Sequence, residues 1–60
     1  MEIHDQIVEQ FSTYLAENSK FADKGVKAAA ARARKALGEL GKLAKSRRAE
    51  IQETKNAANS

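Results

Sequence analysis

The chain has 60 residues, 12 of them alanine, with no cysteine, no proline and one histidine, so it can form only one small domain with a thin core, which usually needs oligomerisation. Because it lacks thiols and a second histidine, we expect no disulfide, metal site, cofactor or enzymatic activity on a small-molecule substrate. The net charge of +3 divides into −4 over residues 1–19, +8 over residues 20–48 and −1 over residues 49–60, an asymmetry typical of proteins that bind polyanions.

The first predicted element is an amphipathic helix over about residues 2–24. Its apolar residues advance at steps of 4, 4, 3 and 7, through Ile3, Ile7, Phe11, Tyr14 and Phe21. These steps are helical and differ from strand alternation. The same phase places the aromatic rings in a core, an interpretation that we favour over stacking on bases. His4, next to Asp5, is expected to lie on the surface.

The turn after this helix is predicted at Gly25. Glycine adopts the left-handed backbone conformation that ends helices, and Lys24 would lie favourably at the negative helix end. Asn18 and Ser19 offer an earlier turn as an alternative. The apolar stripe keeps its phase through Phe21, and this continuity favours Gly25.

The second predicted element is a helix over about residues 26–55, followed by a frayed C-terminus. Its seam advances by alternating steps of 4 and 3, through Val26, Ala30, Ala33, Leu37, Leu40, Ala44, Arg47 and Ile51. This is a heptad pattern that only Arg47 interrupts. The short connection predicts that the two helices run antiparallel.

The expected fold is therefore all-α, an antiparallel two-helix hairpin in one domain spanning residues 1–60. With the turn at Gly25, opposed residue numbers sum to about 50, so that large side chains of the first helix meet small ones of the second. Residues from about 49 onward would have no intrachain partner. A hairpin has a single seam, so we expect it to dimerise or oligomerise into a helical bundle. The expected oligomer core is Ile7, Phe11, Leu37, Leu40, Ala44 and Ile51.

A basic face lies on the second helix, separate from the apolar seam when residues are placed at 100° intervals. Ala31, Gly38 and Gly41 lie among its cations. Small residues there would let a phosphate backbone approach, and the two glycines fit close helix packing equally well. The same pattern also fits a solvated face that only keeps the protein soluble. The residues that we expect to bind DNA are Lys24, Lys27, Arg32, Arg34, Lys35, Lys42, Lys45 and Arg48.

The stretch Lys24-Gly25-Val26-Lys27-Ala28-Ala29, continued by Arg32-Ala33-Arg34-Lys35-Ala36, resembles the bacterial histone H1-like family of the chlamydial nucleoid-condensing type. The likeness covers about residues 20–51. It implies sequence-tolerant DNA binding and chromosome condensation, carried here by Lys24, Gly25, Lys27, Arg32, Arg34, Lys35, Lys42 and Lys45. The chain differs in having Val26 where asparagine is common and in lacking a long Lys/Ala/Pro-rich tail. As a tail-less form, it would bind through its folded helices.

The leading hypothesis is thus a nucleoid-associated, cytoplasmic protein that compacts or bridges duplex DNA through the phosphate backbone, with RNA as a further partner to test. The alternative is a coiled-coil interaction or scaffold protein without a nucleic-acid role. No window has the roughly 18 apolar residues of a membrane span. A basic helix on anionic lipid fits poorly, because the second helix lacks an aromatic apolar edge.

Overall fold

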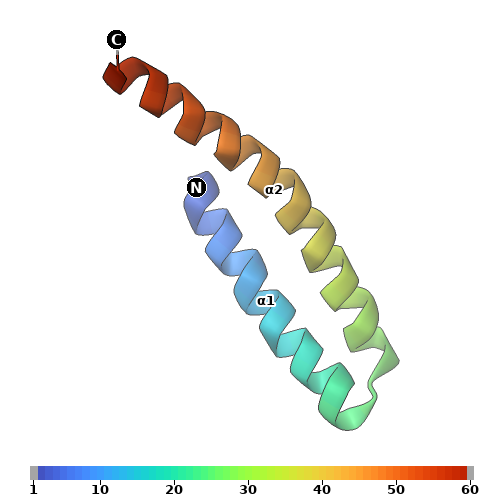
Figure 1. The fold of residues 1–60 in the computed structure, drawn as a ribbon. Helices are drawn as coiled ribbons and strands as arrows, with labels where there is room; N and C mark the ends of the chain where they lie inside the picture. Colours follow the sequence, from blue (N-terminus) through green and yellow to red (C-terminus); the bar gives the residue numbers. More distant parts are fainter. Residues whose placement is uncertain (1, 60) are drawn as a thin grey trace.

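The computed structural model describes residues 2–59, which form two α-helices and no strand. Helix α1 spans Ile3–Lys24 and helix α2 spans Lys27–Asn59. The two helices run antiparallel and side by side, as Figure 1 shows. The predicted all-α helical hairpin is confirmed.

The turn lies at Gly25, and α1 continues without a break through Asn18 and Ser19. Gly25 has a left-handed backbone with φ 67°. Its N–H donates to the carbonyl of Phe21 at 2.8 Å, and the N–H of Val26 donates to that of Lys20 at 3.5 Å. The bond from Gly25 to Phe21 is the 5→1 bond of an αL helix end, and the two bonds together satisfy carbonyls of the last turn of α1. A side chain at this position would be strained, so glycine determines where the chain reverses.

The register of the hairpin agrees with the expected pairing. Glu17 on α1 forms an ion pair with Arg32 on α2. Further from the turn, Gln10 and Thr13 line the same groove as Ala36 and Glu39. In each case residues that lie across from one another have numbers that sum to about 50, as a short turn at Gly25 requires.

The contact between the helices uses alanines of α2. Ala29, Ala33 and Ala36 are the buried apolar residues of the described chain, and no large side chain is fully buried. Small side chains let two helices approach closely, so that larger side chains can pack beside them. The partly buried residues beside this contact include Ile3, Ile7, Tyr14 and Glu17 on α1 and Leu40, Leu43, Arg47 and Glu50 on α2.

The observed contact is rotated from the predicted seam. Ala33, Leu40 and Arg47 belong to both, but Leu37, Ala44 and Ile51 are exposed. Phe11 and Phe21 are also exposed, so that of the three aromatic rings that we placed in a core only Tyr14 is partly buried. The reason is that α2 places its smallest side chains against α1, which directs its larger apolar side chains to one side.

The C-terminal part of α2 extends past the N-terminus of α1 (Figure 1). The hairpin is accordingly a rod measuring 52 × 17 × 14 Å. Residues 51–57 are exposed, as expected for a segment without an intrachain partner. Helix α2 continues to Asn59, whereas the sequence predicted an end near residue 55. The sequence also predicted that the last turns fray from about Lys55 to Ser60, but the helix continues through Asn59, and Ser60 lies outside the described residues.

Candidate nucleic-acid interface

Positive charge is concentrated on α2, which has nine basic and three acidic side chains, whereas residues 2–24 have two basic and five acidic ones. Six of the nine cations lie outside the interhelical contact, with Lys35 at the edge of the groove between the helices. Taking the middle of the interhelical contact as zero and 100° per residue, they occupy an arc from about 100° to 260°. We call this set the basic ridge: Lys27, Arg34, Lys35, Lys42, Lys45 and Arg48.

The basic ridge is exposed and nearly free of ion pairs. All six residues are exposed. Lys42 lies 3.8 Å from a carboxylate oxygen of Glu39, with its side chain 80% exposed. Around the other five, no carboxylate of the described residues lies within salt-bridge distance. Exposed pairs such as Lys42–Glu39 contribute little, so the charge of the ridge is available to a polyanion.

The surface between these cations is formed by small residues, Ala31, Gly38 and Gly41. A Cβ atom added at Gly38 or Gly41 would meet nothing within 4 Å. Neither glycine is therefore needed for close packing inside the hairpin, which was one of their two interpretations. Because these three residues have small side chains or none, the helix backbone is not covered between the long cationic side chains. A phosphate backbone can therefore approach the helix closely there.

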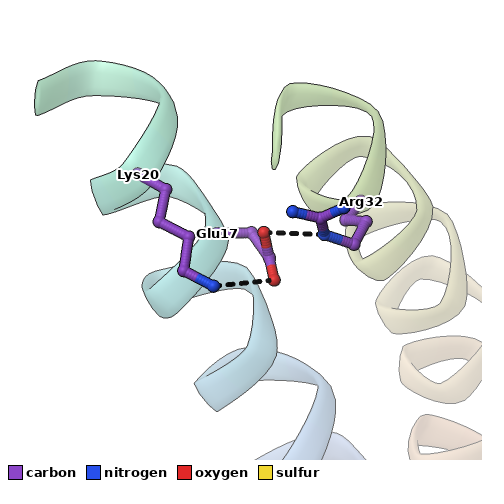
Figure 2. Close-up of polar contacts among 3 residues, drawn as sticks. All are labelled: Glu17, Lys20 and Arg32. Atoms are coloured by element: carbon purple, nitrogen blue, oxygen red, sulfur yellow. Dashed lines mark ion pairs between the residues drawn. The ribbon is translucent and has the colours of Figure 1, made fainter. Parts of the chain in front are cut away.

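Arg32 does not belong to the ridge, because it pairs with α1. Figure 2 shows Glu17 between Lys20 and Arg32. Nε of Arg32 lies 2.9 Å from Oε2 of Glu17, and Nζ of Lys20 lies 3.7 Å from Oε1. The Glu17 side chain is only 12% exposed. Its Oε2 atom accepts no hydrogen bond of good geometry, so the contact with Arg32 is mainly ionic.

The other predicted DNA-binding residue outside the ridge is Lys24, which is exposed at the last turn of α1 beside Gly25. It lies at the end of the rod where the ridge begins.

The role of Glu17 was not predicted from the sequence. One signal in the sequence could have indicated it. Glu17 and Arg32 have opposite charges, and their residue numbers sum to 49, as expected for residues that face each other across the turn.

A polar groove runs between the helices on one side of the hairpin. It is lined by Gln10, Thr13, Arg32, Lys35, Ala36 and Glu39.

Within the described chain, no three metal-ligating side chains cluster. Neither helix combines the length and the apolar composition needed to cross a membrane.

The opposite side of the hairpin carries exposed apolar residues from both helices. On α1, Val8, Phe11 and Leu15 lie about 100° to 160° from the interhelical contact, and on α2, Leu37, Ala44 and Ile51 lie about 60° to 100° from it. Because the helices are antiparallel, these rotations bring both sets to the same side. We call them the apolar face: Val8, Phe11, Leu15, Leu37, Ala44 and Ile51.

The residues expected to form an oligomer core thus divide between two places. Phe11, Leu37, Ala44 and Ile51 lie on the apolar face, where they are exposed. Ile7 and Leu40 are partly buried and take part in the contact within the hairpin. Ile7 and Leu40 are therefore assigned to the folding of one chain.

Comparison with known proteins gives one family. A family model described as histone H1-like protein Hc1 matches residues 1–57. Neither a curated protein nor a solved structure matches the chain. The match includes α1 and the overhanging part of α2, in addition to the region whose residues carry the resemblance.

Proposed function

Because the chain belongs to the Hc1 family of histone H1-like proteins, we propose that it is a sequence-tolerant DNA-binding protein of the nucleoid whose basic ridge lies along the phosphate backbone. The family supports a histone-like DNA-binding protein in general and is not a family of enzymes. The observation that carries the proposal is the ridge itself: six exposed cations on one arc of α2, of which only Lys42 lies near a described carboxylate.

The ridge has dimensions that suit a duplex. From Lys27 to Arg48 it extends for about 32 Å, close to one turn of B-DNA. No asparagine or glutamine lies between these residues, so the side chains that read adenine by paired hydrogen bonds are absent there. Lysine and arginine rows position a protein on phosphates without reading sequence. The geometry therefore supports binding with little sequence preference.

Counterion release should supply most of the affinity. A protein that neutralises six phosphates loses affinity with a log–log slope of about −5, or about a thousandfold between 50 and 200 mM salt. The test is a fluorescence titration of a duplex at several salt concentrations, with two unrelated duplex sequences. Binding that is indifferent to salt, or no binding at low salt, contradicts the proposal.

Paired variants locate the binding surface. Arg34→Gln with Lys45→Gln removes two ridge charges and should reduce the magnitude of the salt slope by about 2. Lys20→Gln with Lys55→Gln removes the same charge away from the ridge and is the matched control. If both double variants change the slope equally, the net charge matters and the ridge does not. A single-stranded RNA and an RNA duplex in the same titration measure the preference for DNA.

Compaction is the finer part of the proposal. One ridge can coat a duplex, whereas an oligomer with two ridges can hold two duplexes together. Oligomerisation into a helical bundle therefore accompanies the proposed function. Light scattering of a long duplex on addition of protein distinguishes condensation from coating, and the Arg34→Gln, Lys45→Gln variant should not condense DNA.

The exposed apolar face favours a second candidate function. In it, the chain is an interaction protein that binds a partner helix, and its charged residues determine the register of that helix. The two candidates predict different effects of the combined variant Arg34→Gln, Lys35→Gln, Lys42→Gln and Lys45→Gln. Loss of DNA binding with unchanged assembly favours the DNA-binding protein. Loss of assembly, measured by sedimentation, favours the interaction protein.

A further inference from the structure

The cations of the basic ridge fall into two rows along α2. The first row lies about 100° to 165° from the middle of the interhelical contact and consists of Lys27, Arg34, Lys45 and Arg48. The second row lies at about 225° to 245°, nearer the polar groove, and consists of Lys35 and Lys42. All six side chains are exposed. Two separate rows can contact two phosphate strands, whereas a single row follows only one.

The strip of α2 between the two rows has only small residues. Ala31, Gly38 and Ala49 lie there, at about 185° to 205°, and all three are exposed. A Cβ atom added at Gly38 would meet nothing within 4 Å. Nothing longer than a methyl group therefore projects from this strip. It has no side chain that could read a base edge or insert between base pairs.

The separation of the rows matches the minor groove of B-DNA. In the middle of the ridge, Arg34 and Lys45 are rotated by about 80° from Lys35 and Lys42. On a helix 10–12 Å in diameter, this rotation places the rows about 7 Å apart at the helix surface, and farther apart where the side chains extend. The minor groove is about 6 Å wide. The helix is too wide to enter it, but its two rows can reach the phosphates on both edges.

The major groove fits the same rows poorly. It is about 12 Å wide and admits a whole helix, so that its two phosphate walls lie on opposite sides of that helix. Rows only about 80° apart would then face the floor of the groove, where the base edges lie. Lysine and arginine in that position contact guanine, and the result would be a preference for G·C pairs. The two grooves thus predict opposite base preferences.

We infer that the basic ridge lies over the minor groove of a B-form duplex, with one row of cations on each phosphate strand. The inference rests on the proposed DNA binding and adds which groove is contacted. A minor groove narrowed by A·T pairs has a stronger negative potential, which attracts lysine and arginine. The ridge therefore favours A·T-rich duplexes severalfold, a preference small enough for sequence-tolerant binding. The minor groove of an RNA duplex is wide and shallow, and rows this close together do not span it.

Base analogues that change one groove at a time test the inference. Inosine in place of guanine removes an amino group from the minor groove only, and uracil in place of thymine removes a methyl group from the major groove only. In fluorescence titrations at one salt concentration, the inosine duplex should bind about three- to fivefold more tightly than the parent duplex. The uracil duplex should bind within about 1.5-fold of the parent, because the minor groove is unchanged.

The failure of this inference differs from the failure of the proposed function. No binding to any of the three duplexes at low salt contradicts DNA binding itself. Salt-dependent binding with equal affinity for the guanine and inosine duplexes overturns the minor-groove contact alone. Tighter binding to the guanine duplex than to the inosine duplex also overturns it.

A pair of double variants tests whether the inosine preference needs both rows. Lys35→Gln with Lys42→Gln removes the second row and should reduce the preference to below about 1.5-fold, because the remaining row follows one strand. Lys27→Gln with Arg48→Gln removes the same charge from the ends of the first row and is the matched control. It should weaken binding to both duplexes by a similar factor and keep the preference. Equal loss of the preference in both double variants would mean that net charge determines it, and this result overturns the two-row contact.

Discussion

At the scale of single residues, the Glu17–Arg32 pair is the best-defined polar contact between the helices. Its carboxylate is largely shielded, whereas the Arg32 side chain is 52% exposed. A half-exposed pair gains less than a buried one, because water screens it. It still fixes the register, since a carboxylate removed from solvent must keep its cation.

We predict that a double-mutant cycle with Glu17→Gln and Arg32→Gln gives a coupling free energy of about 1 kcal/mol in thermal unfolding. The control is Glu39–Lys42, an exposed pair within α2, for which the coupling should be below about 0.5 kcal/mol. Equal couplings would show that the contact between the helices contributes no more than a surface pair.

Replacement of Gly38 and of Gly25 by alanine should change the free energy of unfolding in opposite directions. Gly38→Ala should raise the free energy of unfolding by about 0.5–1 kcal/mol, because the site is helical, exposed and open to a Cβ. Gly25→Ala should lower it by about 1–2 kcal/mol, because alanine is strained at positive φ. Circular dichroism during urea unfolding measures both. If Gly38→Ala also weakens DNA binding, the low surface of the ridge contributes to contact with the duplex; a loss of stability would contradict the open site.

At the scale of elements, the sequence was sufficient for both helices and the turn. The apolar stripe without a break at Asn18 and Ser19, and a glycine after it, specify α1 and its end through local backbone preference. The position of the basic ridge also followed from the sequence, since charges spaced by helical periodicity need no knowledge of a partner.

The phase of α2 was harder to predict, because its sequence contains two overlapping heptads. One includes Leu37 and Ala44, and the other includes Ala29 and Ala36; both include Ala33. Apolar size alone favours the first. Close approach of two helices favours the second, and only the packing in three dimensions decides between them. The same limit applies to Arg32, whose pairing depends on what α1 brings opposite it.

The overhanging end of α2 should be dispensable for DNA binding. Removing residues 52–60 leaves every ridge residue and Ile51 in place, and the lost segment contains one cation and one carboxylate. We predict that the truncated chain binds a duplex within about twofold of the full chain at equal salt, since neither the ridge nor the net charge changes. Titration of the same duplex checks it. A large loss would show that the overhang contacts DNA.

At the scale of the whole molecule, stability and assembly should be inseparable. The three buried alanines of the described residues provide little apolar burial against the conformational entropy of ordering the chain, and the exposed apolar face contains the larger side chains. If a second copy covers that face, unfolding releases two chains, and mass action raises the melting temperature with concentration.

A hundredfold increase in protein concentration adds about 2.7 kcal/mol per dimer, which corresponds to roughly 10 °C for about 120 residues unfolding together. We therefore predict that Tm, followed by circular dichroism from about 5 to 500 μM, rises by several degrees. Leu37→Gln should lower Tm most at high concentration, where the parent chain is most fully assembled, whereas Ala31→Gln should follow the parent chain throughout. A Tm that does not depend on protein concentration would mean that the hairpin folds as a monomer. Association through the apolar face would then contribute nothing to the stability of the fold.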